Sequence, residues 1–141
     1  MLKIVGTPVS QAYEFANLKH GNQKYGEFPY IYHLVQVCDM TLKMGLSEEF
    51  QIVAYLHDIL EDTETYYSEL CEKFGESVAN CVAELTHNPK EDYTDYLKGL
   101  TLPARKVKIC DILCNLQESI LVGNERLIKK YQKALFYLAT N

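Results

Sequence analysis

The sequence lacks both a long apolar run and an excess of positive charge. No stretch reaches the ~18 consecutive apolar residues that a membrane-spanning helix needs, so we expect no membrane span. The chain carries 14 Lys and Arg against 19 Asp and Glu, which gives a formal net charge of −5. This balance argues against a broad face that binds nucleic acid or anionic lipid. A small phosphorylated ligand stays compatible with it, because a metal ion can supply local positive charge.

The sequence also lacks a secretory signal and a cysteine pattern typical of disulfides. The first ten residues, M-L-K-I-V-G-T-P-V-S, contain one lysine, and Gly6 and Pro8 interrupt their short apolar piece. The cysteines are odd in number, form no C-x-x-C motif and mostly lie in apolar helical contexts. They are Cys38, Cys71, Cys81, Cys110 and Cys114. We expect reduced, buried thiols and therefore a cytoplasmic protein.

Strand patterns are almost absent, whereas apolar residues recur with the 3.6-residue period of helices. The 141 residues are 48% apolar and 23% charged, and they contain no internal repeat, linker or low-complexity tract. This profile predicts one all-α domain spanning residues 1–141, with about seven to eight helices. The expected helices cover roughly residues 10–19, 32–43, 47–63, 66–74, 76–86, 93–99, 104–121 and 124–138. Residues 21–29 and 87–91 are expected to form loops.

One stretch, A-Y-L-H-D-I-L-E-D-T at residues 54–63, places four ionisable side chains in an otherwise apolar helix. His57 and Asp58 form one adjacent pair, and Glu61 and Asp62 form the other. Several charges buried together are costly unless each of them is compensated. A solvated helix face would not normally carry this many Leu, Ile, Val and Ala neighbours. A metal ion is the simplest compensation.

The spacing within this stretch suits metal binding followed by acid–base chemistry. Residues four apart share one helix face, so His57 is expected beside Glu61, and Asp58 beside Asp62. The His-Asp pair can offer an imidazole nitrogen and a carboxylate oxygen to one divalent cation, which needs about two to four further ligands. The second pair would stay one turn away, free to act on a water molecule.

Two other predicted helices can supply the missing ligands. His33 opens the second helix directly after P-Y-I-Y. In the long helix at residues 104–121, Lys108, Asp111 and Asn115 form a polar stripe among apolar neighbours. Asp111 is thus a carboxylate on a helix that is otherwise expected to be buried. The candidate metal ligands are His33, His57, Asp58 and Asp111.

Each of these features alone also has an ordinary structural interpretation. His33 could be a core histidine with a satisfied hydrogen bond, and Asp111 could pair with Lys108 or Lys106. Glu61 and Asp62 could form a solvated helix end. The joint pattern is more specific than its parts, because it combines a histidine, a His-Asp pair, a Glu-Asp pair and a late aspartate in one order.

This order of residues resembles the HD-domain metal-dependent phosphohydrolases. Longer stretches resemble, more narrowly, the guanosine-3′,5′-bis(diphosphate) 3′-pyrophosphohydrolases, which include the hydrolase domain of SpoT-type enzymes and small stand-alone relatives. The stretches are H-G-N-Q-K-Y-G-E-F-P-Y-I-Y-H at residues 20–33, L-H-D-I-L-E-D-T at 56–63 and F-G-E-S-V-A-N-C-V-A-E-L-T at 74–86. The later stretches E-D-Y-T-D-Y-L, V-K-I-C-D-I-L-C-N and R-L-I-K-K-Y-Q-K-A-L are similar to the small, single-domain branch.

The resemblance implies an HD-domain helical globule that binds one Mn²⁺ through the four candidate ligands; another divalent transition metal would suit the same ligands. It implies that Glu61 and Asp62 position and deprotonate a water molecule held by the metal. That water would attack the 3′-diphosphate of (p)ppGpp and release pyrophosphate and GDP or GTP. The implied substrate-binding residues are Lys24, Asn115 and Tyr131, and the implied partner is a small-molecule nucleotide. Neither the residues nor the resemblance specifies an oligomeric state.

The chain departs from the family pattern in the residues expected to bind substrate. The family's loop before the first histidine is richer in Arg and Lys, whereas Q-K-Y-G-E-F-P here contains Lys24 and the acidic Glu27. An arginine that stacks on guanine is missing, and Tyr25 or Phe28 would have to replace it. Cys114 stands directly before Asn115, where the family often has a histidine.

Two alternative functions therefore remain open at the level of sequence. The chain could be another HD-type phosphohydrolase, such as a nucleotidase that acts on a nucleoside monophosphate. It could instead be a non-catalytic module that keeps the metal for structure or senses a nucleotide. The Glu-Asp pair beside the His-Asp pair favours the 3′-pyrophosphohydrolase, and the thinned basic loop favours the nucleotidase.

Overall fold

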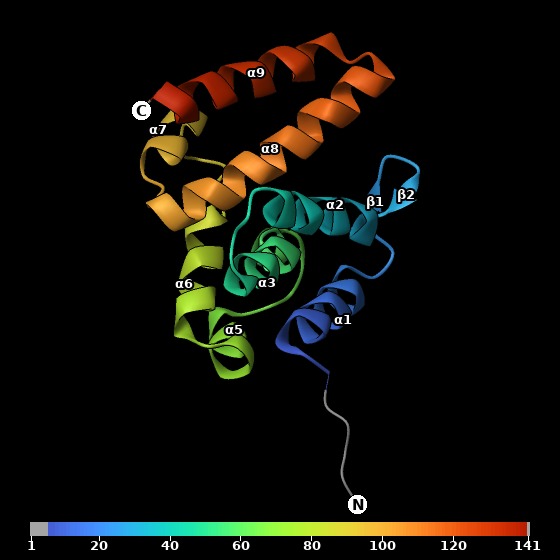
Figure 1. Ribbon diagram of the computed structural model, residues 1–141, viewed down its shortest axis with the longest axis vertical. Coiled ribbons are helices and arrows are strands. Elements are labelled where there is room, and N and C mark those ends of the chain that lie inside the picture. Colours follow the sequence, from blue (N-terminus) through green and yellow to red (C-terminus); the bar gives the residue numbers. More distant parts are fainter. Residues whose placement is uncertain (1–5, 141) are drawn as a thin grey trace, which may run out of the picture.

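The computed structural model describes residues 6–140, which form helices and one short hairpin (Figure 1). Residues 1–5, on which the sequence-based expectation about a secretory signal partly rests, lie outside the described residues, as does residue 141. The helices are α1 (Pro8–His20), α2 (Tyr30–Lys43), α3 (Glu48–Leu56), α4 (Ile59–Asp62), α5 (Tyr67–Phe74), α6 (Glu76–Leu85), α7 (Tyr93–Lys98), α8 (Leu102–Val122) and α9 (Glu125–Thr140). The expectation of an all-α fold is confirmed. None of these helices is long and apolar enough to cross a membrane.

Hydrogen bonds and a glycine at the helix ends fix where several helices begin and end. The hydroxyl of Thr7 accepts a hydrogen bond from the N–H of Ser10 at 3.1 Å and caps α1. The carboxylate of Glu84 accepts from both the N–H and the hydroxyl of Thr101 at 2.9 Å, immediately before α8. α8 ends at Gly123, whose φ of 71° is readily adopted by glycine.

The single helix expected at residues 47–63 is wrong, because α3 and α4 are separated by His57 and Asp58. The ring of His57 donates from Nδ1 to the carbonyl of Ala54 at 2.6 Å, an oxygen that a continuous helix would pair with the N–H of Asp58. The backbone of Asp58 leaves the helical region, with φ −102° and ψ 1°. If α3 and α4 are taken together as the one expected helix, residues 6–140 contain eight helices, within the expected number.

The expected loop at residues 21–29 contains a small antiparallel hairpin. Strands β1 (Lys24–Tyr25) and β2 (Phe28–Pro29) pair with Tyr25 opposite Phe28, and Gly26 turns the chain with a φ of 61°. Strands of two residues are too short to show a period, which is why the sequence pattern did not reveal them. The hairpin packs against the start of α2 (Figure 1).

The core lies where α2, α3 and α8 meet (Figure 1). α3 packs against α1, α2 and α6, while α8 packs against α2 and against α9, which runs back along it. Leu34 of α2, Leu56 of α3 and Ile112 of α8 are each completely buried. Because these residues neighbour His33, His57 and Asp111 in the sequence, core packing brings three distant segments of the chain to one place.

Ile59 lies directly after the break between α3 and α4 and is completely buried. Ile59→Ala should lower the free energy of unfolding by about 2–5 kcal/mol, because it leaves a cavity in the core. The matched variant Leu121→Ala, at a side chain 77% exposed, should change it by less than about 0.5 kcal/mol. Urea unfolding measures both changes. Equal effects of the two variants would contradict the packing described here.

Candidate metal centre

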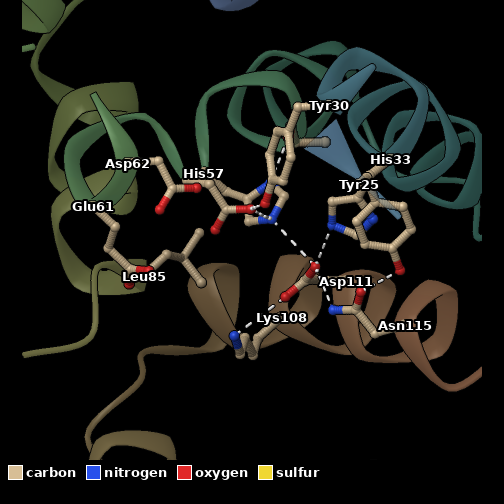
Figure 2. A network of polar contacts seen from close by, with 12 residues as sticks. Tyr25, Tyr30, His33, His57, Glu61, Asp62, Leu85, Lys108, Asp111 and Asn115 are labelled. Atoms are coloured by element: carbon tan, nitrogen blue, oxygen red, sulfur yellow. Dashed lines mark hydrogen bonds and ion pairs between the residues drawn. The ribbon is translucent and has the colours of Figure 1, made fainter. Parts of the chain in front are cut away.

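Four side chains from three segments of the chain converge on one point (Figure 2). His33 comes from the first turns of α2, and Asp111 comes from the middle of α8. The adjacent His57 and Asp58 come from the break between α3 and α4. One ligand atom from each of these residues lies within 4.8 Å of every other, which is the spacing expected around a single metal ion.

The cluster is buried in apolar surroundings. His33, His57 and Asp111 are 1%, 2% and 5% exposed, and Asp58 is half-buried. Carboxylates at this depth cost free energy unless a positive charge or several hydrogen bonds compensate them. Burial in the structure therefore creates the same need for a compensating positive charge that the sequence predicted.

The ring of His57 fits a metal ion at the centre of the cluster. Its Nδ1 bonds the Ala54 carbonyl, so Nε2 carries the lone pair in the neutral ring. Nε2 is buried without a hydrogen bond, and it lies 3.1 Å from Asp58 Oδ2 and 3.3 Å from Asp111 Oδ1. A lone pair that faces two carboxylates is repelled by both. A divalent cation between the three groups would turn this repulsion into coordination.

The charges of these groups also shift one another's pKa values. Burial lowers the pKa of His57, but Asp58 and Asp111 raise it more, so the net pKa lies well above the usual value. Burial acts to raise the pKa of Asp111, but Lys108 and then His57 outweigh it and hold that pKa well below the usual range. The site thus attracts positive charge, and a divalent ion can replace the proton on His57.

Two further side chains hold the carboxylates in place. The hydroxyl of Tyr30 donates to Asp58 Oδ2, and the ammonium group of Lys108 lies 3.2 Å from Asp111 Oδ2. Burial raises the pKa of Tyr30, so its hydroxyl remains a donor at neutral pH. The sequence reasoning missed Tyr30, although its position three residues before His33 on one helix was a usable signal.

The Glu-Asp pair lies beside the cluster, on the side opposite Asn115 (Figure 2). Both residues are solvent-exposed, and their carboxylates are held by other segments. Glu61 accepts a hydrogen bond from the backbone N–H of His87, and Asp62 accepts one from Gln23 Nε2 at 2.9 Å. Neither partner had a signal in the sequence, because each lies more than 25 residues away.

Although Glu61 as a whole is exposed, its carboxylate lies against the backbone of His87, and this local loss of solvent raises its pKa; Asp58 raises it further. The hydrogen bond from the backbone of His87 acts in the opposite direction but does not cancel the rise. A carboxylate with a raised pKa is a stronger base than an ordinary glutamate, which suits proton transfer near neutral pH.

The three candidate substrate-binding residues lie at different distances from the cluster. Asn115 is close, because its Nδ2 donates to Asp111 Oδ1 at 3.1 Å. Tyr131 of α9 is half-buried. Its pKa is raised first by burial and next by the negative charge of Asp111, so its hydroxyl lies within electrostatic reach of the cluster. Lys24 on β1 is exposed, and its ammonium group forms no hydrogen bond or ion pair with the part of the chain that is described.

Comparison with known proteins assigns the chain to a family. Residues 12–95 match the HD domain family. The guanosine-3′,5′-bis(diphosphate) 3′-pyrophosphohydrolase of Aquifex aeolicus (strain VF5) is 47% identical over 87 residues, which are 60% of this chain and 12% of that protein. The enzyme of the same name from Danio rerio, MESH1, is 32% identical over 116 residues, which are 74% of this chain and 64% of that protein. The chain thus spans less than two thirds of either relative.

Among solved structures, one described as a metazoan ortholog of SpoT that hydrolyses ppGpp superposes with a TM-score of 0.80 at 22% identity. The match covers 97% of this chain and 88% of that one, and it shows that the two share a fold. The family match spans more than half of the 141 residues and includes three of the four clustered side chains. This chain belongs to the HD domain family.

Proposed function

We propose that this chain is a metal-dependent phosphohydrolase that removes the 3′-pyrophosphate of (p)ppGpp and yields GDP or GTP and pyrophosphate. The observation that carries the proposal is the buried two-histidine, two-aspartate cluster with the Glu61-Asp62 pair beside it. Relatives named for this activity support it. We propose further that residues 1–141 form one HD domain. A small-molecule nucleotide would be its ligand, and its free cysteines suit the cytoplasm.

The proposed metal ion is Mn²⁺. Two imidazoles together with two carboxylates favour a transition metal over Mg²⁺, which prefers oxygen ligands. When bound, the ion supplies positive charge that lowers the pKa of water and polarises phosphoryl oxygens. Its proposed ligands are His33, His57, Asp58 and Asp111.

Glu61 is the proposed general base, and Asp62 helps to position the attacking water. The water oxygen bonds to phosphorus in the 3′-diphosphate, and its proton passes to the carboxylate of Glu61. The bond between that phosphorus and the ribose 3′-oxygen breaks, the 3′-oxygen takes up a proton from solvent, and Glu61 then releases the proton it accepted to solvent. The hydrogen bond from Gln23 holds Asp62 in a fixed orientation during this step.

Lys24, Asn115 and Tyr131 are the proposed contacts to the nucleotide. Asn115 uses one amide hydrogen on Asp111 and keeps a second for the nucleotide. Lys130, whose ammonium group lies 5.4 Å from the ring centre of Tyr131, adds positive charge for the phosphates. Lys108 of α8, next to Asp111, and Lys130 of α9 thus add positive charge to that of Lys24 on the hairpin.

A nucleotidase is the second candidate, because Lys24 is the only cation in residues 21–29, where Glu27 is also present. Such a loop suits a substrate with fewer phosphates than (p)ppGpp. A non-catalytic module that binds metal or senses nucleotide is the third. The three functions differ in their products: pyrophosphate, orthophosphate or none.

A panel of nucleotides with Mn²⁺ separates these functions. We expect ppGpp to yield pyrophosphate and GDP in equal amounts, because the 3′-diphosphate leaves as one unit. Chromatography of the nucleotides with a pyrophosphate-specific assay measures both products. Orthophosphate from nucleoside monophosphates would establish the nucleotidase instead, and no product from any nucleotide would establish the binding module.

Removal of the metal should lower the melting temperature, because an ion that binds the folded state stabilises it. Mn²⁺ at about 100 times its dissociation constant should raise the free energy of unfolding of the metal-free protein by about 2.7 kcal/mol. Asp58→Ala should abolish both this stabilisation and turnover, whereas Asp39→Ala, at an exposed carboxylate on α2, should keep both. Thermal unfolding with and without chelator measures the effect. A melting temperature that changes neither with chelator nor with Mn²⁺ would be incompatible with the proposed site.

Glu61→Gln should keep the metal and lose about 10²–10⁴-fold in kcat, because the amide cannot accept the proton of water. Glu64→Gln, an exposed carboxylate three residues later, is the matched control and should keep the full rate. Metal content and steady-state rates are measured together. Full activity of Glu61→Gln at normal metal content would show that another group removes the proton.

A further inference from the structure

Tyr25 lies at the turn of the β1–β2 hairpin, and its side chain lies against His33 at the edge of the candidate metal centre, with its hydroxyl directed toward Asn115 (Figure 2). Its ring stacks on the imidazole of His33, with ring centres 4.4 Å apart and planes 18° from parallel. One face of the Tyr25 ring is therefore already occupied by a candidate metal ligand. The sequence had offered this ring as a platform for a nucleotide base, whereas the structure places it against the metal site.

The hydroxyl of Tyr25 connects the hairpin to α8. It donates to Asn115 Oδ1 at 2.6 Å, across 90 residues of sequence. Asn115 Nδ2 in turn donates to Asp111 Oδ1 at 3.1 Å, the same oxygen that lies 2.9 Å from His33 Nε2. Tyr25, Asn115, Asp111 and His33 thus form a closed ring of contacts, visible in Figure 2.

The direction of each hydrogen bond in this ring follows from the carboxylate. An ionised Asp111 can only accept, so Asn115 must present its amide hydrogens to Asp111. The carbonyl oxygen of Asn115 then faces Tyr25, whose hydroxyl must donate. Removal of that hydroxyl leaves the Asn115 carbonyl without this partner and frees the amide to rotate away from Asp111. The orientation of the carboxylate therefore depends on a group in the hairpin.

We propose that Tyr25 is a positioning residue of the metal centre. Its hydroxyl orients Asp111 through Asn115, and its ring fixes the plane of His33. The hairpin thereby orders the ligands before the metal binds, as outer partners of metal ligands do in other sites. This inference rests on the metal binding that belongs to the proposed function. It assigns to this tyrosine a role toward the metal rather than toward the nucleotide base.

Tyr25→Phe tests the role of the hydroxyl, because it keeps the stacked ring. Mn²⁺ affinity is measured by competition with a chelator on the full metal-free chain. We expect the dissociation constant for Mn²⁺ to rise by about 10–100-fold, with kcat recovering when Mn²⁺ is saturating. Tyr32→Phe is the matched control, since its ring stacks on Phe28 of the same hairpin at 4.4 Å without reaching the cluster. It should leave the affinity unchanged.

A double-mutant cycle tests whether Tyr25 acts through Asn115. Asn115→Ala should weaken Mn²⁺ binding as well, and Tyr25→Phe should add little on top of it. Additive losses would overturn the proposed connection. If Tyr25→Phe lowered the melting temperature of the metal-free protein and left the Mn²⁺ affinity unchanged, Tyr25 would have a structural role alone.

The kinetic constants separate this role from a role in substrate binding. Tyr25→Phe should leave KM for the nucleotide unchanged at saturating Mn²⁺. A changed KM with unchanged metal affinity would overturn the inference and place the hydroxyl on the substrate side. Wild-type protein that binds no Mn²⁺ would refute the proposed function itself. Wild-type protein that binds Mn²⁺ no better than Tyr25→Phe would refute only the role of Tyr25.

Discussion

The burial of two imidazoles and two carboxylates around one point is the constraint on which the rest of the structure depends. His57 and Asp111 are almost completely buried, and Nε2 of His57 lies between two carboxylates, 3.1 Å from Asp58 and 3.3 Å from Asp111. Lys108 compensates one side of Asp111, and Tyr30 supports Asp58. These contacts leave the centre of the cluster as the place where positive charge is still required, and a divalent cation would supply it.

The break between α3 and α4 shows how packing and chemistry are coupled. Leu56 and Ile59, on either side of it, are completely buried, so the core holds both ends of the break. The two residues between them, His57 and Asp58, interrupt the helix, and their side chains reach Asp111 of α8 and Tyr30 of α2, respectively. The same core that stabilises the protein thus fixes the geometry of the site, while Glu61 and its neighbour on α4 remain accessible to solvent.

The sequence predicted the helices and the cluster because both leave local signals: apolar periodicity, caps, and ionisable residues in apolar helices. It did not predict the helix break or the hairpin, since the first depends on a side-chain contact and the second is too short for a period. It also missed the partners that orient the site. Gln23 meets Asp62 across 39 residues and Tyr25 meets Asn115 across 90, and such contacts are set by tertiary packing alone.

The most direct measurement is anomalous X-ray diffraction at the manganese absorption edge, from crystals of the full chain grown with Mn²⁺. A single anomalous peak is predicted about 2 Å from a nitrogen or oxygen atom of each of four side chains. These are His33, His57, Asp58 and Asp111. A map without a peak at this point, or with the manganese bound elsewhere and these side chains turned apart, would contradict the account.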